Sequence, residues 1–152
     1  MKTYLKNIGI NSKIAFKNLS NEDYIKRNKI LDTFNKELGK NKNKIIKENS
    51  KDIRGCKRED LIDRLILDKS KIENIQNSIN EIKKFTNPLG KVITKWKRPN
   101  GLTIKKISIP IGVIGVIYES RPDVTPFVSA LCIKSGNVAI LRGGSEAYFS
   151  NR

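Results

Sequence analysis

Apolar residues in the first 86 positions recur every three or four residues, the spacing of an amphipathic α-helix. The pattern is clearest in two groups, one formed by Tyr24, Leu31, Phe34 and Leu38, and one formed by Ile72, Ile75, Ile79 and Ile82. Side chains with this spacing share one face of a helix and are typical of a surface packed against a core. The region 1–86 is therefore predicted to be helical, with the four isoleucines forming a single buried stripe.

Polar side chains predict where these helices begin. Ser20 is followed three residues later by Asp23, and Ser70 by Glu73, which is the spacing of a capping box. Gly39 is a predicted end of the first helix. Between the two helices, two shorter apolar groups predict brief helical segments: Ile45 with Ile46, and Leu61, Ile62, Leu65 and Ile66.

The pattern changes over residues 87–109, which are predicted to form a β-hairpin. Residues 92–97 read as a strand, and Arg98-Pro-Asn-Gly is a strong turn signal. Apolar residues return over 102–109, where Lys105 and Lys106 interrupt the alternation. This interruption favours a bulge near the lysine pair, and the solvated face is predicted to carry Lys95, Lys97 and Lys105.

From residue 110 onward the chain reads as alternating strand and helix. Residues 111–118 form a continuous apolar run rich in β-branched residues, typical of a parallel strand buried on both faces. Thr125 before Pro126 predicts a helix start, and Gly136 predicts the end of that helix. Residues 138–141 then predict a second buried strand. The order indicates a right-handed βαβ crossover and an α/β fold class.

Two loops follow the predicted strands, at the edge of the sheet where such folds bind ligands. They span residues 119–123 and 142–145, and each contains an arginine, Arg121 or Arg142. The second loop also contains two adjacent glycines, which allow close approach of a ligand to the backbone. Neither G-x-G-x-x-G nor G-x-x-x-x-G-K-[ST] occurs. The loops are a candidate site for a phosphate-bearing ligand, with ordinary turn glycines and surface arginines as the alternative.

The formal net charge of +16 first suggests a partner that is a polyanion. However, the sequence contains 23 Lys, 23 Ile and 16 Asn, three residues with A/T-rich codons, and its aromatic residues (7%) do not cluster with the lysines. Nucleic-acid binders usually add aromatic platforms or a base-reading motif to their charge. Compositional drift is therefore the preferred explanation, and a basic nucleic-acid-binding module remains an alternative.

Composition also excludes several kinds of site. The absence of histidine excludes a Ser–His triad, a histidine general base and a histidine metal site. Two cysteines cannot build a disulfide framework or a thiolate zinc site, so no metal is expected. No apolar run approaches the length of about 18 residues that marks a membrane span, and no signal-peptide pattern opens the chain. The expectation is a soluble cytoplasmic protein without a membrane partner.

Four segments resemble gamma-glutamyl phosphate reductase, a family of the aldehyde dehydrogenase superfamily. They are RPNGL at 98–102, IPIGVIGVIYESRPDVT at 109–125, ALCIKSGN at 130–137 and ILRGGSE at 140–146. The resemblance implies an aldehyde dehydrogenase-like α/β fold. Residues 1–86 would form an N-terminal helical region, 87–109 a hairpin that is a candidate oligomerisation arm, and 110–152 the start of a Rossmann-like dinucleotide-binding βαβ unit.

The family implies an activity. Its members reduce L-glutamyl 5-phosphate to L-glutamate 5-semialdehyde with NADPH and release phosphate, a step of proline biosynthesis. A cysteine thiolate attacks the acyl phosphate, and hydride resolves the thioacyl intermediate. The complete enzyme is expected to be a homo-oligomer.

The family's nucleophilic cysteine lies beyond residue 152, so no catalytic residue is assigned and the catalytic domain is expected to be absent. Cys132 is expected to be buried and structural, and Cys56 an incidental surface thiol. The chain is expected to be an inactive N-terminal fragment with an open sheet edge and an exposed apolar face. The alternative is a non-catalytic fragment that docks on a partner through the 92–109 hairpin.

By position, the resemblance assigns the first loop to the cofactor and the reacting centre. Ser120, Arg121 and Pro122 would approach both of them. Asp123 departs from the family, which more often has asparagine at this position, so no role is assigned to it.

The second loop is assigned to the adenosine end of NADPH. Arg142 stands where the wider superfamily places a lysine against the adenosine ribose. Gly143, Gly144 and Ser145 would border the 2′-phosphate.

Overall fold

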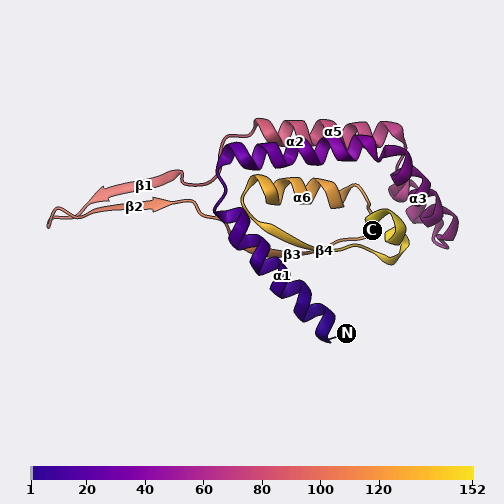
Figure 1. Cartoon of the computed structure of the whole chain (residues 1–152), viewed down its shortest axis with the longest axis horizontal. Coiled ribbons are helices and arrows are strands. Elements are labelled where there is room, and N and C mark those ends of the chain that lie inside the picture. Colours follow the sequence, from indigo (N-terminus) through magenta and orange to yellow (C-terminus); the bar gives the residue numbers. More distant parts are fainter. Residues whose placement is uncertain (1) are drawn as a thin grey trace.

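A layer of helices covers a small parallel sheet, and a β-hairpin projects from one end of the body in the computed structural model, which describes residues 2–152 (Figure 1). The helical part runs through α1 (Lys2–Ser20), α2 (Tyr24–Lys40), α3 (Lys42–Gly55), α4 (Glu59–Leu65) and α5 (Lys69–Lys84). The remaining elements are β1 (Val92–Lys97), β2 (Thr103–Ile107), β3 (Val113–Ile117), α6 (Val124–Lys134), β4 (Val138–Arg142), the 3₁₀ turn η1 (Ser145–Ala147) and α7 (Tyr148–Asn151).

The predicted βαβ unit is present. β3 pairs with β4 in parallel, in a register that places Val113 opposite Val138 and Ile117 opposite Arg142. α6 makes the crossover between them and ends at Lys134, with Ser135 as its C-cap. Gly136 follows with a φ of +67°, in the left-handed region that glycine adopts without strain.

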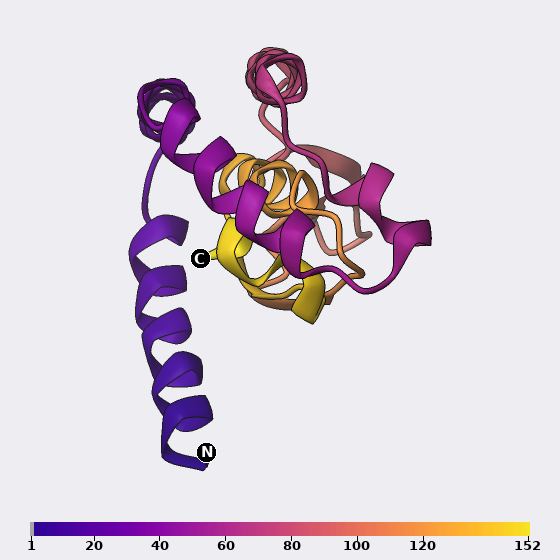
Figure 2. The same cartoon turned by 90° about the vertical axis from the view of Figure 1, so that its right-hand side faces the viewer.

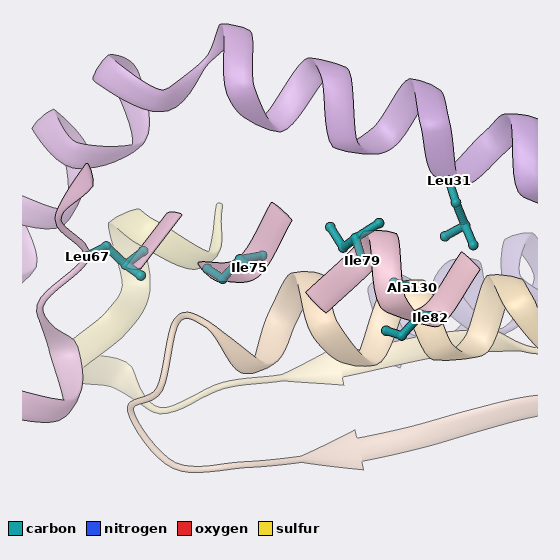
Figure 3. Close-up of a cluster of buried hydrophobic side chains, with 6 residues drawn as sticks. All are labelled: Leu31, Leu67, Ile75, Ile79, Ile82 and Ala130. Carbon is teal, nitrogen blue, oxygen red and sulfur yellow. The ribbon is translucent and has the colours of Figure 1, made fainter. Parts of the chain in front are cut away.

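The core lies where α2 and α5 pack side by side on α6, as Figures 1 and 2 show from two directions. Ile72, Ile75, Ile79 and Ile82 are all buried, so the predicted stripe on α5 is confirmed. Figure 3 shows three of them in one apolar cluster with residues of α2, α6 and the segment before α5; the cluster consists of Leu31, Leu67, Ile75, Ile79, Ile82 and Ala130. The stripe therefore anchors the helical region to the βαβ unit.

Aspartates, not serines, cap α2 and α5, so the predicted helix starts are wrong by a few residues. The carboxylate of Asp23 accepts a hydrogen bond from the backbone N–H of Lys26 at 2.7 Å, and Asp68 caps α5 in the same way. Ser20 is the last residue of α1, where its hydroxyl bonds to a carbonyl of its own helix. A carboxylate at the N-cap accepts a hydrogen bond from a backbone N–H that has no partner within the helix. Its negative charge also interacts favourably with the positive end of the helix dipole, which favours Asp over Ser at this position.

Two further helix boundaries differ from the prediction. α2 continues to Lys40, one residue beyond the predicted end at Gly39. The turn or two expected around Ile45 and Ile46 is a 14-residue helix, α3, whose buried residues Asn49 and Asp52 are polar. Apolar periodicity therefore underestimated its length.

The hairpin has the predicted strands, but its bulge lies on β1 and not on β2 beside the lysine pair, where it was predicted. The register of β1 against β2 shifts between Val92 and Thr94, across from the lysine pair. Lys95 lies directly opposite Lys105, so these lysines share a face as predicted. Every residue of β1 is exposed, however, including Trp96, so both faces of the hairpin are solvated. Its role as an oligomerisation arm stays a prediction.

β3 is not buried on both faces, which corrects the prediction from its apolar run. Ile117 at its end is 85% exposed, as is Ile111 before the strand. Within the described residues β3 pairs only with β4, which leaves one edge open and the expected apolar surface uncovered. A β-branched run thus indicates a strand, while its burial depends on elements that pack against it.

Among residues 2–152, no helix combines the length and the apolar character that crossing a bilayer requires.

Candidate functional site

The two candidate loops lie against each other because β3 and β4 are parallel neighbours that end at the same edge of the sheet. The backbone N–H of Tyr118, the first residue after β3, donates to the carbonyl of Arg142, the last residue of β4, at 3.1 Å. The two loops therefore start side by side, from residues that are hydrogen-bonded to each other.

The second loop lines an open groove of about 670 Å³. Its lining residues are Tyr4, Leu141, Arg142, Gly143, Gly144, Ser145, Tyr148, Asn151 and Arg152. Arg142 and Ser145 are exposed, and Tyr4 comes from α1 at the far end of the chain. The structure thus brings together the four residues that the sequence assigned to the adenosine end of a cofactor.

Gly144 sits where no side chain fits. A Cβ there would overlap the hydroxyl of Ser120 and lie 3.0 Å from the backbone nitrogen of Ser120. Gly143 is similarly close, since its Cβ would overlap the side-chain amide of Asn151. Gly144 is therefore needed for the second loop to lie against the first loop, and Gly143 leaves the space that the Asn151 side chain of α7 occupies.

Ser120 ties the two loops together instead of facing the groove. It is 2% exposed, and its hydroxyl donates to the Glu146 carboxylate at 2.5 Å. This hydrogen bond is the main cause that lowers the pKa of Glu146, and a backbone N–H adds to it. The sequence did not predict this role of Glu146, because its partner lies 26 residues away along the chain.

We expect Ser120→Ala to raise the pKa of Glu146 toward its usual value of 4.5. A carboxyl whose folded pKa is lowered contributes stability above its unfolded pKa and loses it as the pH falls through the folded pKa. In the wild type the stabilisation from the Ser120–Glu146 hydrogen bond is therefore lost progressively as the pH falls below 4.5. NMR titration of the Glu146 side-chain carboxyl carbon measures this, and a midpoint that does not move in the variant contradicts it.

Two further hydrogen bonds join the end of β3 to α6 and α7. The Thr125 hydroxyl donates to the side-chain carbonyl of Asn151 at 2.7 Å. Because a hydroxyl has one hydrogen, Thr125 must accept from the Tyr118 hydroxyl, 2.5 Å away. Thr125 lies inside α6 and does not cap it, since the helix begins at Val124 after Asp123, so the predicted start was wrong by two residues.

The other two residues assigned to the first loop lie outside the groove lining. Arg121 is exposed. Pro122 is buried and lines a small apolar cavity of about 190 Å³ between the helices, together with residues such as Phe34 and Ile75. The two loops thus supply different surfaces, and the groove belongs to the second loop.

Neither cysteine lines the groove. Cys132 is buried in α6, and burial raises the pKa of its thiol. Cys56 is half-buried and its thiol donates to the carbonyl of Arg58 at 3.3 Å. Within the part of the chain that the structure describes, no three His, Cys, Asp or Glu residues gather as they would around a metal ion.

No family model matches the chain, but individual proteins do. A gamma-glutamyl phosphate reductase of Clostridium tetani is 42% identical over 156 residues, covering 100% of this chain and 36% of the relative. One of Clostridium acetobutylicum is 44% identical over 155 residues, with 99% and 37% covered. This chain is homologous to gamma-glutamyl phosphate reductase. The resemblance of the four segments is confirmed.

Solved structures of gamma-glutamyl phosphate reductase have the same fold. The Thermotoga maritima protein superimposes with a TM-score of 0.87 at 36% identity, over 92% of this chain and 35% of the other. The Saccharomyces cerevisiae protein gives 0.88 at 34% identity, over 95% and 38%. A Bacillus subtilis protein described as an aldehyde dehydrogenase gives 0.74 at 19% identity. The aldehyde dehydrogenase-like α/β fold is confirmed, and the chain spans about a third of the length of its gamma-glutamyl phosphate reductase relatives.

Proposed function

We propose that the groove beside Arg142–Ser145 binds the phosphate-bearing adenosine end of NADPH, in a cytoplasmic protein of proline biosynthesis. The reaction would be that of gamma-glutamyl phosphate reductase, reduction of L-glutamyl 5-phosphate to L-glutamate 5-semialdehyde with release of phosphate. NADPH would supply the hydride. The single observation that carries the proposal is an exposed arginine beside a double glycine, in a groove at the carboxyl end of a parallel strand.

The residues of the groove fit a phosphate group. Within residues 2–152, Arg142 takes part in no salt bridge, so its charge is available to a ligand. Gly143 and Gly144 keep side chains away from the backbone, and Ser145 is exposed. Guanidinium groups bind phosphate through charge-assisted hydrogen bonds with fixed geometry, which suits Arg142 to this role.

Binding and catalysis are separate properties of this chain. The family's reaction needs a thiolate, and the thiols described here lie away from the groove, with that of Cys132 buried and its pKa raised. We therefore propose that this chain binds NADPH and does not by itself reduce the acyl phosphate. Incubating it with glutamate 5-semialdehyde, phosphate and NADP⁺ should yield no NADPH, and its formation would refute this part of the proposal.

Arg142→Ala is expected to weaken NADPH binding about 10- to 150-fold, because a hydrogen bond to a charged group contributes roughly 1.5–3 kcal/mol. Titration of NADPH fluorescence measures the dissociation constant. Arg98→Ala is the matched control, since Arg98 is an exposed arginine in the hairpin turn and takes part in none of the recorded salt bridges. Equal affinities of the wild type and both variants would contradict the assignment of Arg142.

A further inference from the structure

We propose that Asp52 of α3 is a positioning residue for the groove. Its carboxylate would hold α7 and, through α7, the backbone of Gly143 and Gly144. The inference rests on the proposed function, because it assigns to the helical region a part in shaping the nucleotide site.

All recorded hydrogen bonds of the Asp52 carboxylate go to the first turn of α7. One oxygen accepts from the backbone N–H of Phe149 at 2.9 Å. The other accepts from the backbone N–H of Ser150 at 2.7 Å and from the Ser150 hydroxyl at 2.6 Å. Asp52 thus does for α7 what an N-cap residue does for its own helix, from 97 residues away.

The carboxylate is buried and belongs to a larger polar contact. Asp52 is 4% exposed, and Asn49, one turn earlier on α3, is 1% exposed. The Asn49 amide donates to the Ser150 hydroxyl at 3.0 Å and to the Leu65 carbonyl at 2.7 Å. Its side-chain oxygen accepts from the backbone N–H of Leu67. A buried polar group is costly unless its partners are in place, so this contact admits little variation in geometry.

The first turn of α7 depends on such a contact. Its N–H groups have no partners within the helix, and starting a helix is the unfavourable step of its formation, so a bonded acceptor at this end stabilises the turn. Two bonded N–H groups in its first turn and the Ser150 hydroxyl are held by one carboxylate. The conformation of α7 therefore depends on Asp52.

α7 in turn shapes the groove. Tyr148 and Asn151 line it beside the glycines. The Asn151 amide occupies the space that a side chain on Gly143 would need, and its carbonyl accepts from Thr125. A shift of α7 would therefore move groove-lining side chains and release the packing on Gly143.

The test compares Asp52→Asn with Asp63→Asn in the full chain. Asp63 is an exposed aspartate on α4 without a recorded salt bridge, so its variant is the matched control. Hydrogen exchange by NMR, without nucleotide, should be about tenfold faster in Asp52→Asn at Phe149 and Ser150, because a bond to a charged acceptor is lost. It should also be faster at Ala147, whose backbone N–H donates to the Gly144 carbonyl at 3.3 Å and so reports on the loop. The amides of Leu31 and Ile79 should exchange as in the wild type, which a general loss of stability would not allow.

NADPH titration is the second measurement, with an expected loss of affinity of about tenfold for Asp52→Asn and none for Asp63→Asn. Unchanged exchange at Ala147, or unchanged affinity despite faster exchange, would overturn the inference. If the wild type does not bind NADPH, the proposed function fails, and exchange at Ala147 alone decides whether Asp52 positions the loop. If Asp52→Asn does not fold, Ser150→Ala removes one hydroxyl from the same contact and is tested in its place.

Discussion

Ile79→Ala is expected to lower the free energy of unfolding by about 3–4 kcal/mol, the middle of the range for isoleucine-to-alanine changes in a core. Ile79 is completely buried where α5 faces α2 and α6 (Figure 3). Removing its outer carbons loses apolar burial and leaves a cavity that rigid helices cannot close. Because this cluster joins the helical region to the βαβ unit, the loss should appear in the whole unfolding transition.

Urea denaturation followed by circular dichroism measures the change as a shift in midpoint at constant slope. Ile25→Ala is the matched control. Ile25 is 65% exposed on α2, so the same substitution should change the free energy of unfolding by less than about 0.5 kcal/mol. A loss at Ile79 no larger than that at Ile25 would show that the cluster in Figure 3 is not the core of the folded chain.

Lys134→Met is expected to lower the free energy of unfolding by about 2–3 kcal/mol, since a buried hydrogen bond to a charged group contributes roughly 1.5–3 kcal/mol and burial of the ammonium offsets part of this. Lys134 is 2% exposed at the end of α6. Its ammonium donates to the Lys83 carbonyl at 2.6 Å, to Asn28 at 2.8 Å and to the Tyr24 hydroxyl at 3.1 Å.

These bonds complete the C-terminus of α5. The Lys83 carbonyl lies in the last turn of α5, where the helix itself supplies no further donor. A positive charge there also interacts favourably with the negative end of the helix dipole. The Tyr24 hydroxyl donates to the carbonyl of Phe85, the residue that follows α5, at 2.9 Å. Asn28 and then Lys134 lower the pKa of Tyr24 through their hydrogen bonds. Methionine would fill the space of Lys134 and leave these acceptors without a donor.

Lys36→Met makes the same chemical change at an exposed lysine of α2 and should have little effect on urea denaturation. If Lys134→Met were as stable as the wild type, the buried ammonium would not be the connection between α6 and the two long helices.

The elements that the sequence predicted well are those with local causes. The stripe on α5, the limits of β1 and the strand–helix–strand order each follow from periodicity and from turn residues such as Gly101 and Gly136. Helix starts were missed where two capping side chains lay close together. Ser20 and Asp23 both match a cap, and the structure uses the carboxylate.

Some residues of the candidate site were recognised from the sequence and others only from the structure, for the same reason. Arg142 and the glycines beside it were recognised because a loop after an apolar strand is visible in the sequence, although β4 is only half-buried and not buried as predicted. Glu146 and Asp52 were not, since their partners lie 26 and 97 residues away. Nothing local distinguishes Asp52 from an ordinary acid on a charged helix.

The sequence by itself determined the α/β class, the order of the elements and the position of the loop at Arg142, because helix, strand and turn preferences depend on neighbours within a few residues. The tertiary structure alone decided which polar side chains are buried, which apolar runs stay exposed and which distant groups hold the groove. Burial and hydrogen-bond partners depend on how elements pack in space, and packing brought Asp52 to α7, Tyr4 to Arg142 and Lys134 to the end of α5.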